Sequence, residues 1–213
     1  MMPGETRDRL IAQRVVPVLR LASAELTERA VDCLVTAGFS TVEITMTTPD
    51  AIALIERLVR RLGSDFVVGA GTVRDADAAQ RCLDAGARFL VSPCLVAGIA
   101  EAAHAAGCAV LIGGFTPGEI LAAQREGADI VKVFPASTGG PEHLRAIHAV
   151  FPDIRLCPTG GVSLQNIAGY FAAGAALVGV GNNIIDQPAL VAGDLTRVAA
   201  HARRFLQPDT FAA

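Results

Sequence analysis

Several residue types are scarce in this chain: it contains no tryptophan, one tyrosine and one lysine, and only 18% of its residues are charged. The formal net charge is −3, and the densest basic run is the short RLVRR at 57–61. A nucleic-acid-binding surface needs a larger excess of positive charge, so we expect no nucleic-acid partner. No apolar run reaches the roughly 20 residues that cross a bilayer, so we expect no membrane partner either.

Paired cysteines are also missing. The five cysteines are widely spaced, odd in number and form no C-x-x-C motif, so we expect neither a disulfide framework nor a zinc site. We interpret them as small core residues of a protein in a reducing compartment. The N-terminal MMPGETRDRLIAQ carries acidic side chains and lacks the apolar segment of a secretory signal, so we expect a cytoplasmic location. The cysteines are Cys33, Cys82, Cys94, Cys108 and Cys157.

The sequence does contain a glycine that recurs about every 20 to 25 residues, or at twice that spacing, after helix-like stretches. Between these glycines, short and nearly continuous apolar runs predict strands buried on both faces, as in a parallel sheet. The glycines are Gly38, Gly63, Gly86, Gly107, Gly127 and Gly174. The strands are predicted at 15–19, 41–46, 66–70, 88–92, 109–113, 130–134, 154–158 and 176–181.

Amphipathic stretches connect the predicted strands. Those at 75–86 and 163–174 begin with Asp75 and Ser163, residue types that favour the N-cap of a helix. Eight strand-helix units in 213 residues predict an α/β protein with one domain, residues 1–213, folded as a (β/α)8 TIM barrel. The alternative is a doubly wound open sheet, which has fewer strands for this length and one dominant glycine-rich loop.

Two charged residues lie inside otherwise apolar predicted strands, Glu43 in TVEITM and Lys132 in IVKVF. Active sites of TIM barrels form at the C-terminal ends of the strands, so both are candidate catalytic residues. Burial would favour the neutral amine of Lys132, which forms an imine with a carbonyl carbon, as arginine cannot. Glu43 would then move the protons that imine chemistry requires. The alternative is a purely structural ion pair inside the barrel.

Glycine and amide residues follow the last two predicted strands. Gly160 and Gly161 in PTGGV, with Gly181 and Asn182 in GVGNN, would let backbone N–H groups approach an anion closely. Because the loops after strands 7 and 8 of TIM barrels commonly bind phosphate, we predict a phosphate site here.

A carboxylate site and the absence of a metal site are predicted from other residues at the strand ends. Arg20 and Thr72 are placed to bind a small carboxylate through a guanidinium and a hydroxyl, although Arg20 is also explained as a solvent-facing rim residue. No histidine or carboxylate pair is predicted at the rim, so we expect no metal. The histidines, which lie in helix-like stretches, are His104, His143, His148 and His201.

The motifs VVPVLR, VEITMTTPDA, VGAGTV, FLVSPCL, VKVFPAS, CPTGGV and VGVGNNI, in this order, resemble the class I 2-keto-3-deoxy-6-phosphogluconate (KDPG) aldolases. Their relatives act on the galactonate epimer and on 4-hydroxy-2-oxoglutarate (KHG). The resemblance covers nearly the whole chain. It implies a (β/α)8 homotrimer without metal or other cofactor, in which Lys132 forms the Schiff base and Glu43 carries protons.

The resemblance also implies the substrate contacts. The pyruvate carboxylate would lie near Thr72 and Pro93, and Thr159 would meet a substrate hydroxyl. The predicted substrate-binding residues are Arg20, Thr72, Pro93, Phe134, Thr159, Gly160, Gly161, Gly181 and Asn182.

Three positions depart from the family pattern. Many members have arginine where this chain has Thr47, whereas others place it at the end of the first strand, as Arg20 is placed here. Asn182 stands where the family often has a phosphate-binding serine, and its amide can still donate a hydrogen bond. Gly113 replaces a common proline.

The expected function is that of a class I aldolase that cleaves KDPG to pyruvate and glyceraldehyde 3-phosphate. Alternatives within this family are an aldolase for the galactonate epimer or for KHG. Outside it, the alternatives are a metal-dependent barrel aldolase, a phosphosugar epimerase, and a phosphosugar-binding barrel without catalytic activity.

Overall fold

The computed structural model describes residues 3–207, where eight strands form one parallel sheet. The strands are β1 Val15–Leu19, β2 Thr41–Thr45, β3 Val67–Gly71, β4 Phe89–Val91, β5 Ala109–Gly114, β6 Ile130–Val133, β7 Leu156–Pro158 and β8 Val178–Val180. Neighbouring strands follow the chain order from β1 to β7, and β8 returns to pair with β1. β7 meets β8 through two isolated bridges, Leu156 with Ala175 and Thr159 with Gly179. The sheet is therefore a nearly closed barrel, and the expected TIM fold is confirmed.

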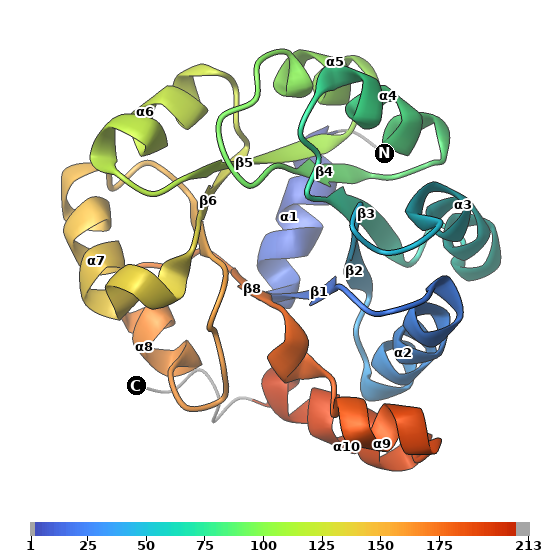
Figure 1. The fold of residues 1–213 in the computed structure, drawn as a ribbon. Coiled ribbons are helices and arrows are strands. Elements are labelled where there is room, and N and C mark those ends of the chain that lie inside the picture. The colour runs from blue at the N-terminus through green and yellow to red at the C-terminus, as the bar shows by residue number, and fades with distance from the viewer. Residues whose placement is uncertain (1–2, 208–213) are drawn as a thin grey trace.

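Helices surround this barrel (Figure 1). They are α1 Pro3–Gln13, α2 Ala24–Ala37, α3 Ala51–Leu62, α4 Ala76–Asp84, α5 Ile99–Ala105, α6 Pro117–Arg125, α7 Ala136–Val150, α8 Ile167–Ala172, α9 Gln187–Ala192 and α10 Leu195–Arg203, with the 3-10 helices η1 Asn182–Ile184 and η2 Arg204–Leu206. In the view along the barrel axis, α2 to α8 follow one another around the strands. Each of the helices among residues 3–207 is too short or too polar to cross a bilayer.

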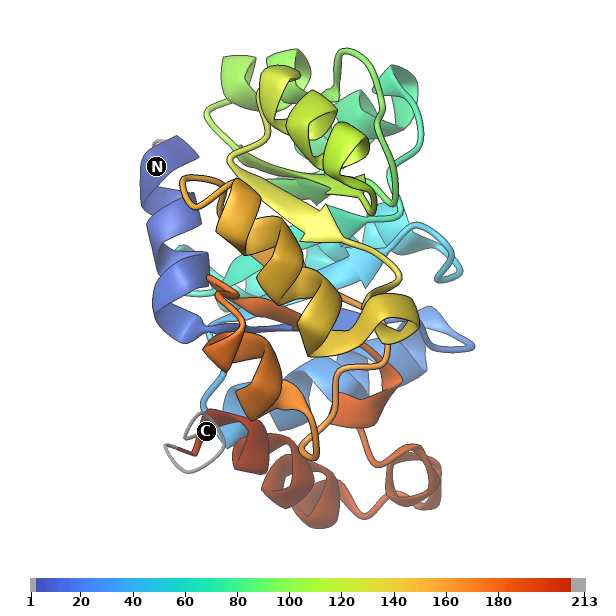
Figure 2. The same ribbon diagram turned by 90° about the vertical axis from the view of Figure 1, so that its left-hand side faces the viewer.

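One end of the barrel is closed by α1, which lies across the N-terminal ends of the strands (Figure 2). Leu10 of α1 is fully buried and belongs to the cluster that fills the barrel interior. Val67, Phe89 and Ile130 belong to the same cluster, and they come from three different strands. The polar residues that line the barrel therefore gather at the opposite, C-terminal end.

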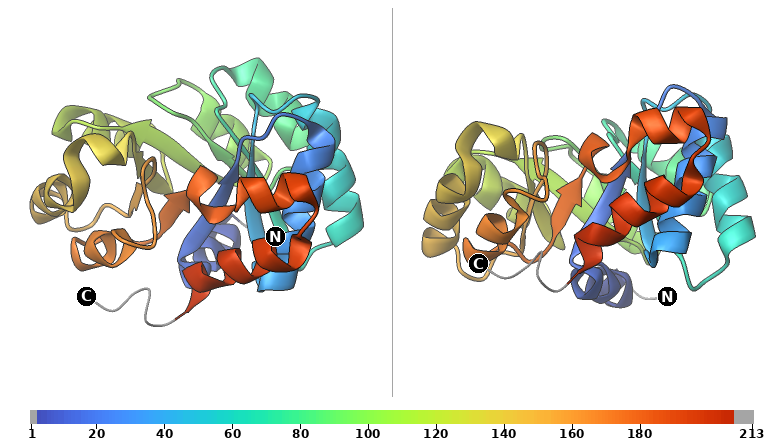
Figure 3. Two further views of the ribbon diagram at one scale, coloured as in Figure 1. Left: turned by 60° about the horizontal axis from the view of Figure 1, so that its bottom comes forward. Right: turned by 90° about the horizontal axis from the view of Figure 1, so that it is seen from below.

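A second and larger cluster lies between the strands and the surrounding helices. It extends to α9 and α10, which pack beside α2 (Figure 3). The guanidinium Nη2 of Arg203 donates a hydrogen bond to the carbonyl of Thr36 at 2.7 Å, and that of Arg29 to the carbonyl of Leu190 at 3.3 Å. These contacts join the last helices to the start of the barrel.

The structure confirms most of the elements predicted from sequence. Every predicted strand is present, with boundaries shifted by at most two residues, and all six repeated glycines have positive φ angles. The predicted start of a helix at Ser163 is wrong, because the Ser163 N–H donates to the side chain of Asn166 in a turn and α8 begins only at Ile167. Cys94 is also not a core residue, since it is exposed, whereas the other four cysteines are buried.

Candidate active site

A cavity of about 280 Å³ opens at the C-terminal ends of the strands. It collects residues from β1, β2 and β6 and from the loops that follow β3, β7 and β8. The lining residues are Val18, Arg20, Glu43, Thr45, Thr72, Lys132, Phe134, Thr159, Gly160, Gly161, Gly181, Asn182 and Asn183.

Lys132 projects into this cavity from β6 and is only 6% exposed. Its strand neighbours in the register are Gly113 of β5 and Cys157 of β7. The Nζ atom lies 5.3 Å from the centre of the Phe134 ring, and it makes no hydrogen bond or ion pair with any residue in the part of the chain that the structure describes. The amine is therefore buried, next to a cavity, and free to react with a ligand there.

Glu43 of β2 is the second buried ionisable residue of the cavity, with 3% exposure. Its Oε1 atom accepts no hydrogen bond from residues 3–207. Burial raises the pKa of Glu43 above its usual range, and the positive charges of Lys132 and Arg20 oppose this shift. A carboxyl group with a raised pKa can both hold and release a proton closer to neutral pH, which suits an acid and base catalyst.

Arg20 and Thr72, which the sequence predicts as a carboxylate-binding pair, lie next to each other in the lining of the cavity. Nη2 of Arg20 donates a hydrogen bond to Oγ1 of Thr72 at 3.4 Å. Thr72 has a φ of 60°, a left-handed conformation that is rare for a β-branched residue and costs on the order of 1–3 kcal/mol. Such strain is common at ligand-binding sites, because it fixes the direction of a side chain.

The far side of the cavity is formed by backbone. Gly160 and Gly161 have φ angles of 94° and 78°, and their carbonyl groups accept hydrogen bonds from Ser137 N and Asn166 Nδ2. Their N–H groups donate no hydrogen bond within residues 3–207. Gly181 and Asn182, at the start of η1, line the same cavity. This side of the cavity therefore presents N–H donors to an anion.

Thr159 lines the same cavity and is 6% exposed. Its hydroxyl donates a long hydrogen bond of 3.4 Å to the carbonyl of Cys157. Burial raises the pKa of the Cys157 thiol to about 11, so the thiol stays protonated at neutral pH and is a poor nucleophile. The Thr159 hydroxyl, which lines the cavity, can form a hydrogen bond with a ligand there.

Ten of the eleven site residues predicted from sequence line this one cavity. The exception is Pro93, whose backbone instead lies against Gly113, the strand neighbour of Lys132. Val18 and Asn183 line the cavity and were not predicted, because an apolar residue and an amide give no chemical signal in the sequence. Thr45 lies at a strand end beside Glu43, a position that could have identified it.

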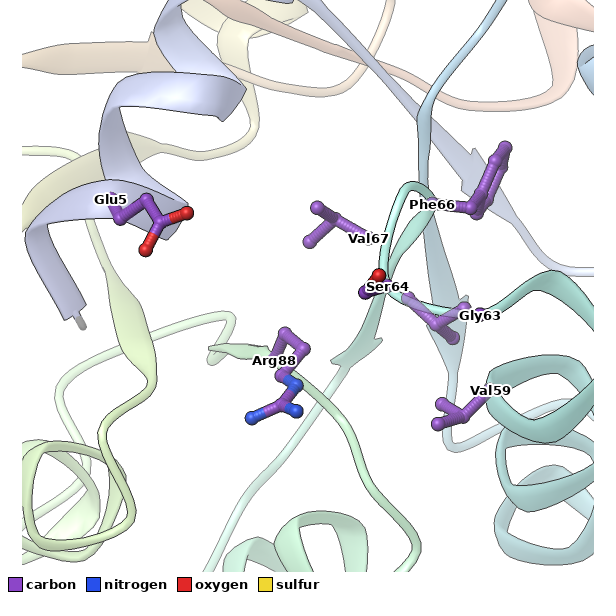
Figure 4. Close-up of a pocket in the computed structure, with 8 residues that line it drawn as sticks. Glu5, Val59, Gly63, Ser64, Phe66, Val67 and Arg88 are labelled. Atoms are coloured by element: carbon purple, nitrogen blue, oxygen red, sulfur yellow. The ribbon is translucent and has the colours of Figure 1, made fainter. Parts of the chain in front are cut away.

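Another cavity, of about 360 Å³, lies at the opposite end of the barrel between α1, the end of α3 and the first residues of β3 (Figure 4). Glu5 of α1 and Arg88, just before β4, contribute its charged side chains. Both are exposed, so water screens their charges. This cavity lacks the desolvated reactive groups that distinguish the C-terminal one.

No group of three or more His, Cys, Asp or Glu side chains placed to hold a metal ion occurs within residues 3–207. The histidines predicted to lie away from the site do so, on α5, α7 and α10.

Comparison with known proteins gives consistent matches along the chain. The family model for KDPG and KHG aldolases matches residues 6–201. A probable 2-dehydro-3-deoxy-6-phosphogalactonate aldolase of Rhizobium meliloti is 37% identical over 186 residues, or 87% of each chain. A 2-dehydro-3-deoxy-phosphogluconate aldolase of Dickeya dadantii is 35% identical over 91% of each chain.

Solved structures match as well. The KDPG aldolase of Legionella pneumophila, with pyruvate captured at low pH as a covalent carbinolamine intermediate, has a TM-score of 0.84 and 28% identity. That match covers 93% of this chain and 96% of the other.

Proposed function

The chain belongs to the KDPG and KHG aldolase family and is an aldolase, a carbon–carbon lyase, and we propose that it cleaves KDPG to pyruvate and glyceraldehyde 3-phosphate. The observation that carries this proposal is that one cavity contains both the amine of Lys132, which makes no hydrogen bond or ion pair with residues 3–207, and the buried carboxyl of Glu43. An amine and a proton carrier are the two groups that cleavage through an imine requires.

In the proposed reaction, the nitrogen lone pair of Lys132 attacks the C2 ketone of the substrate, a proton of the nitrogen passes to the ketone oxygen, and a carbinolamine forms. Protonated Glu43 gives its proton to the carbinolamine hydroxyl, which leaves as water, and the C2–N bond becomes an iminium. The carboxylate of Glu43 then removes the proton of the C4 hydroxyl.

As this proton leaves, the C4 oxygen forms the aldehyde carbonyl and the C3–C4 bond breaks. The electron pair of that bond passes into the iminium, which becomes an enamine. Protonated Glu43 returns the proton to C3, and water hydrolyses the resulting imine to release pyruvate and the free amine of Lys132.

The two ends of the substrate fit the two ends of the cavity. We propose that Arg20 and Thr72 bind the carboxylate next to C2, since the guanidinium of Arg20 lies beside the Thr72 hydroxyl in the lining of the cavity. The phosphate would lie against the N–H groups around Gly160, Gly161 and Asn182. Lys132 lines the same cavity, where we propose that it meets C2 of the substrate.

The test is reduction with borohydride in the presence of pyruvate, which converts an imine into a stable amine. Lys132 is the only lysine, so the N-terminal amino group is the only other primary amine of the chain. Peptide mapping by mass spectrometry should find the adduct on the peptide that contains Lys132. An unmodified Lys132 peptide would contradict the proposal.

Two variants separate chemistry from folding. Lys132→Arg keeps a positive charge beside Glu43 but forms no imine, and Lys132→Met removes the charge as well. We expect both to lose turnover by more than about 10³-fold and to remain folded by circular dichroism. Retained turnover in Lys132→Arg would show that only the charge matters.

The galactonate epimer is a second candidate substrate, because the relative at 37% identity is named for it. The two epimers differ in configuration at C4, the carbon whose hydroxyl loses its proton. We propose that the Thr159 hydroxyl favours the gluconate epimer. Steady-state rates with both epimers and with KHG test this, and Thr159→Val should reduce the preference by about 10-fold, the effect of losing one hydrogen bond.

We also propose that the enzyme is a homotrimer, as its resemblance to the family implies. Light scattering should then give three times the 22.0 kDa mass of one chain.

A further inference from the structure

Gly71, the last residue of β3, lies directly against the carboxyl group of Glu43 on the neighbouring strand. A β carbon added to Gly71 would lie 1.8 Å from Oε1 of Glu43, 2.5 Å from its Cδ and 2.7 Å from its Cγ. These distances are far shorter than van der Waals contact, so any side chain at position 71 would occupy the space of the carboxyl group.

The backbone of Gly71 does not require glycine. Its φ lies outside the left-handed range, and the residue pairs regularly with Thr45 of β2 and Val91 of β4. Any L-amino acid adopts this strand conformation, and glycine inside a strand is less stable than most residues. The missing side chain is therefore explained by the space that Glu43 needs.

The register explains how the carboxyl comes to rest there. Glu43 is directly opposite Gly69, and its side chain leans two residues further along β3 toward the mouth of the barrel. The space over Gly69 is filled by the ring of Phe89, since a β carbon at Gly69 would lie 2.3 Å from that ring. The carboxyl group thus lies against the backbone of Gly71, where no side chain occupies the space.

We propose that Gly71 is a positioning residue of the aldolase reaction: it leaves the space that holds the Glu43 carboxyl at the level of the Lys132 amine. This inference rests on the proposed function, in which Glu43 moves the protons. A methyl group at position 71 displaces the carboxyl from the reacting carbon and oxygen atoms, and proton transfer is sensitive to displacements of about 1 Å.

The first experiment compares Gly71→Ala with the wild type. Exchange of the pyruvate methyl protons for deuterium, followed by NMR, reports proton transfer between the imine and the enamine. We expect the exchange rate and kcat to fall on the order of 10²-fold with KM little changed, while borohydride still attaches pyruvate to Lys132. Exchange and kcat within about twofold of the wild type would overturn the inference.

The matched control is Gly69→Ala, on the same strand and the same face. Its added methyl crowds the Phe89 ring instead of the carboxyl, so it should lower the urea midpoint while retaining most of the exchange rate. If both variants lose exchange equally, crowding in general is responsible and the inference fails.

A second experiment tests the contact even if Gly71→Ala folds poorly. The three atoms nearest to the added β carbon all belong to Glu43 beyond its own β carbon, so Glu43→Ala removes them. Gly71→Ala should therefore shift the urea midpoint strongly in the wild type and little in Glu43→Ala. An equal shift in both backgrounds, or a double variant that does not fold, contradicts the contact.

The outcomes also separate this inference from the proposed function. If pyruvate and borohydride leave wild-type Lys132 unmodified, the proposed function fails, whatever the stability measurements give. If the wild type is modified and Gly71→Ala keeps normal exchange, only the role of Gly71 is wrong.

Discussion

At the scale of single residues, Glu43 serves the proposed chemistry at the expense of stability. Its carboxyl is buried, its Oε1 atom accepts no hydrogen bond from the described part of the chain, and its pKa is raised mainly by burial. The folded protein therefore binds the Glu43 proton more tightly than the unfolded chain does. This contribution to stability is complete below the unfolded pKa, near 4.3, and is lost as the pH rises through the raised pKa.

Glu43→Gln should consequently stabilise the protein, and increasingly so as the pH rises. The amide has the same shape and carries no charge to desolvate, so we expect a gain on the order of 1 kcal/mol at pH 8 and little change at pH 4. Urea unfolding at both pH values measures it. A gain that is larger at pH 4 would mean that Glu43 is held as a stabilising carboxylate.

Glu119 is the control, because its environment is the opposite. Hydrogen bonds from the backbone N–H groups of Thr116 and Phe115 lower its pKa. Its contribution to stability is thus present above the unfolded pKa and lost as the pH falls through the lowered one. Glu119→Gln should destabilise the protein at pH 8 more than at low pH.

At this scale, the sequence predicts those residues whose chemistry differs clearly from that of their neighbours in the chain. Lys132 and Glu43 are visible as charges in apolar strands, and their burial is confirmed. The empty space at Gly71 is not visible, because it depends on the register of β2 against β3. Pro93 was predicted to lie near the substrate and does not line the cavity, since its backbone turns toward Gly113.

At the scale of elements, α6 begins with a complete capping box at the cavity end of the barrel. The Thr116 hydroxyl accepts a hydrogen bond from Glu119 N at 3.3 Å, and the Glu119 carboxylate accepts one from Thr116 N at 2.8 Å. Thr116→Ala should lower the free energy of unfolding by about 0.5–2 kcal/mol, measured in urea, with kcat unchanged.

Thr36→Ala is the matched control for this cap. Thr36 is an exposed threonine whose hydroxyl donates to the carbonyl of Asp32 inside α2, where it caps nothing. We expect an effect within about 0.5 kcal/mol. Equal losses in the two variants would show that the capping box contributes no more than an ordinary threonine.

Helices and strands could be predicted where the residues of a single segment are sufficient to identify it. The continuous apolar runs identified all eight strands, and Asp75 caps α4 as expected, accepting a hydrogen bond from Ala78 N at 2.7 Å. The predicted start of α8 was wrong. Ser163 and Asn166 are both residue types that favour the N-cap of a helix, but the hydrogen bond from Ser163 N to Asn166 Oδ1 places Ser163 in the turn before the helix. α1 was not predicted, since its buried face meets a partner only after the barrel has formed.

At the scale of the whole molecule, the number of strand-helix units predicted the barrel, but closure depends on long-range pairing. β1 pairs with β8 from opposite ends of the chain, and β7 meets β8 through two bridges only. The cavity draws residues from β1, β2, β6 and the loops after β7 and β8, so it exists only in the closed barrel. A ligand of this cavity therefore binds the folded state alone and should stabilise the entire molecule.

Pyruvate should accordingly raise the melting temperature of the wild type through its covalent bond to Lys132. At about 100 times its dissociation constant, a ligand adds about 2.7 kcal/mol, or roughly 5–10 °C for a chain of this size. Lactate offers the same carboxylate with a hydroxyl in place of the ketone, so it forms no imine and should give a smaller shift by scanning calorimetry. In Lys132→Met the pyruvate shift should fall to that of lactate, because only the proposed contacts of Arg20 and Thr72 with the carboxylate would remain. A full pyruvate shift in that variant would mean that the keto group is bound by something other than the amine.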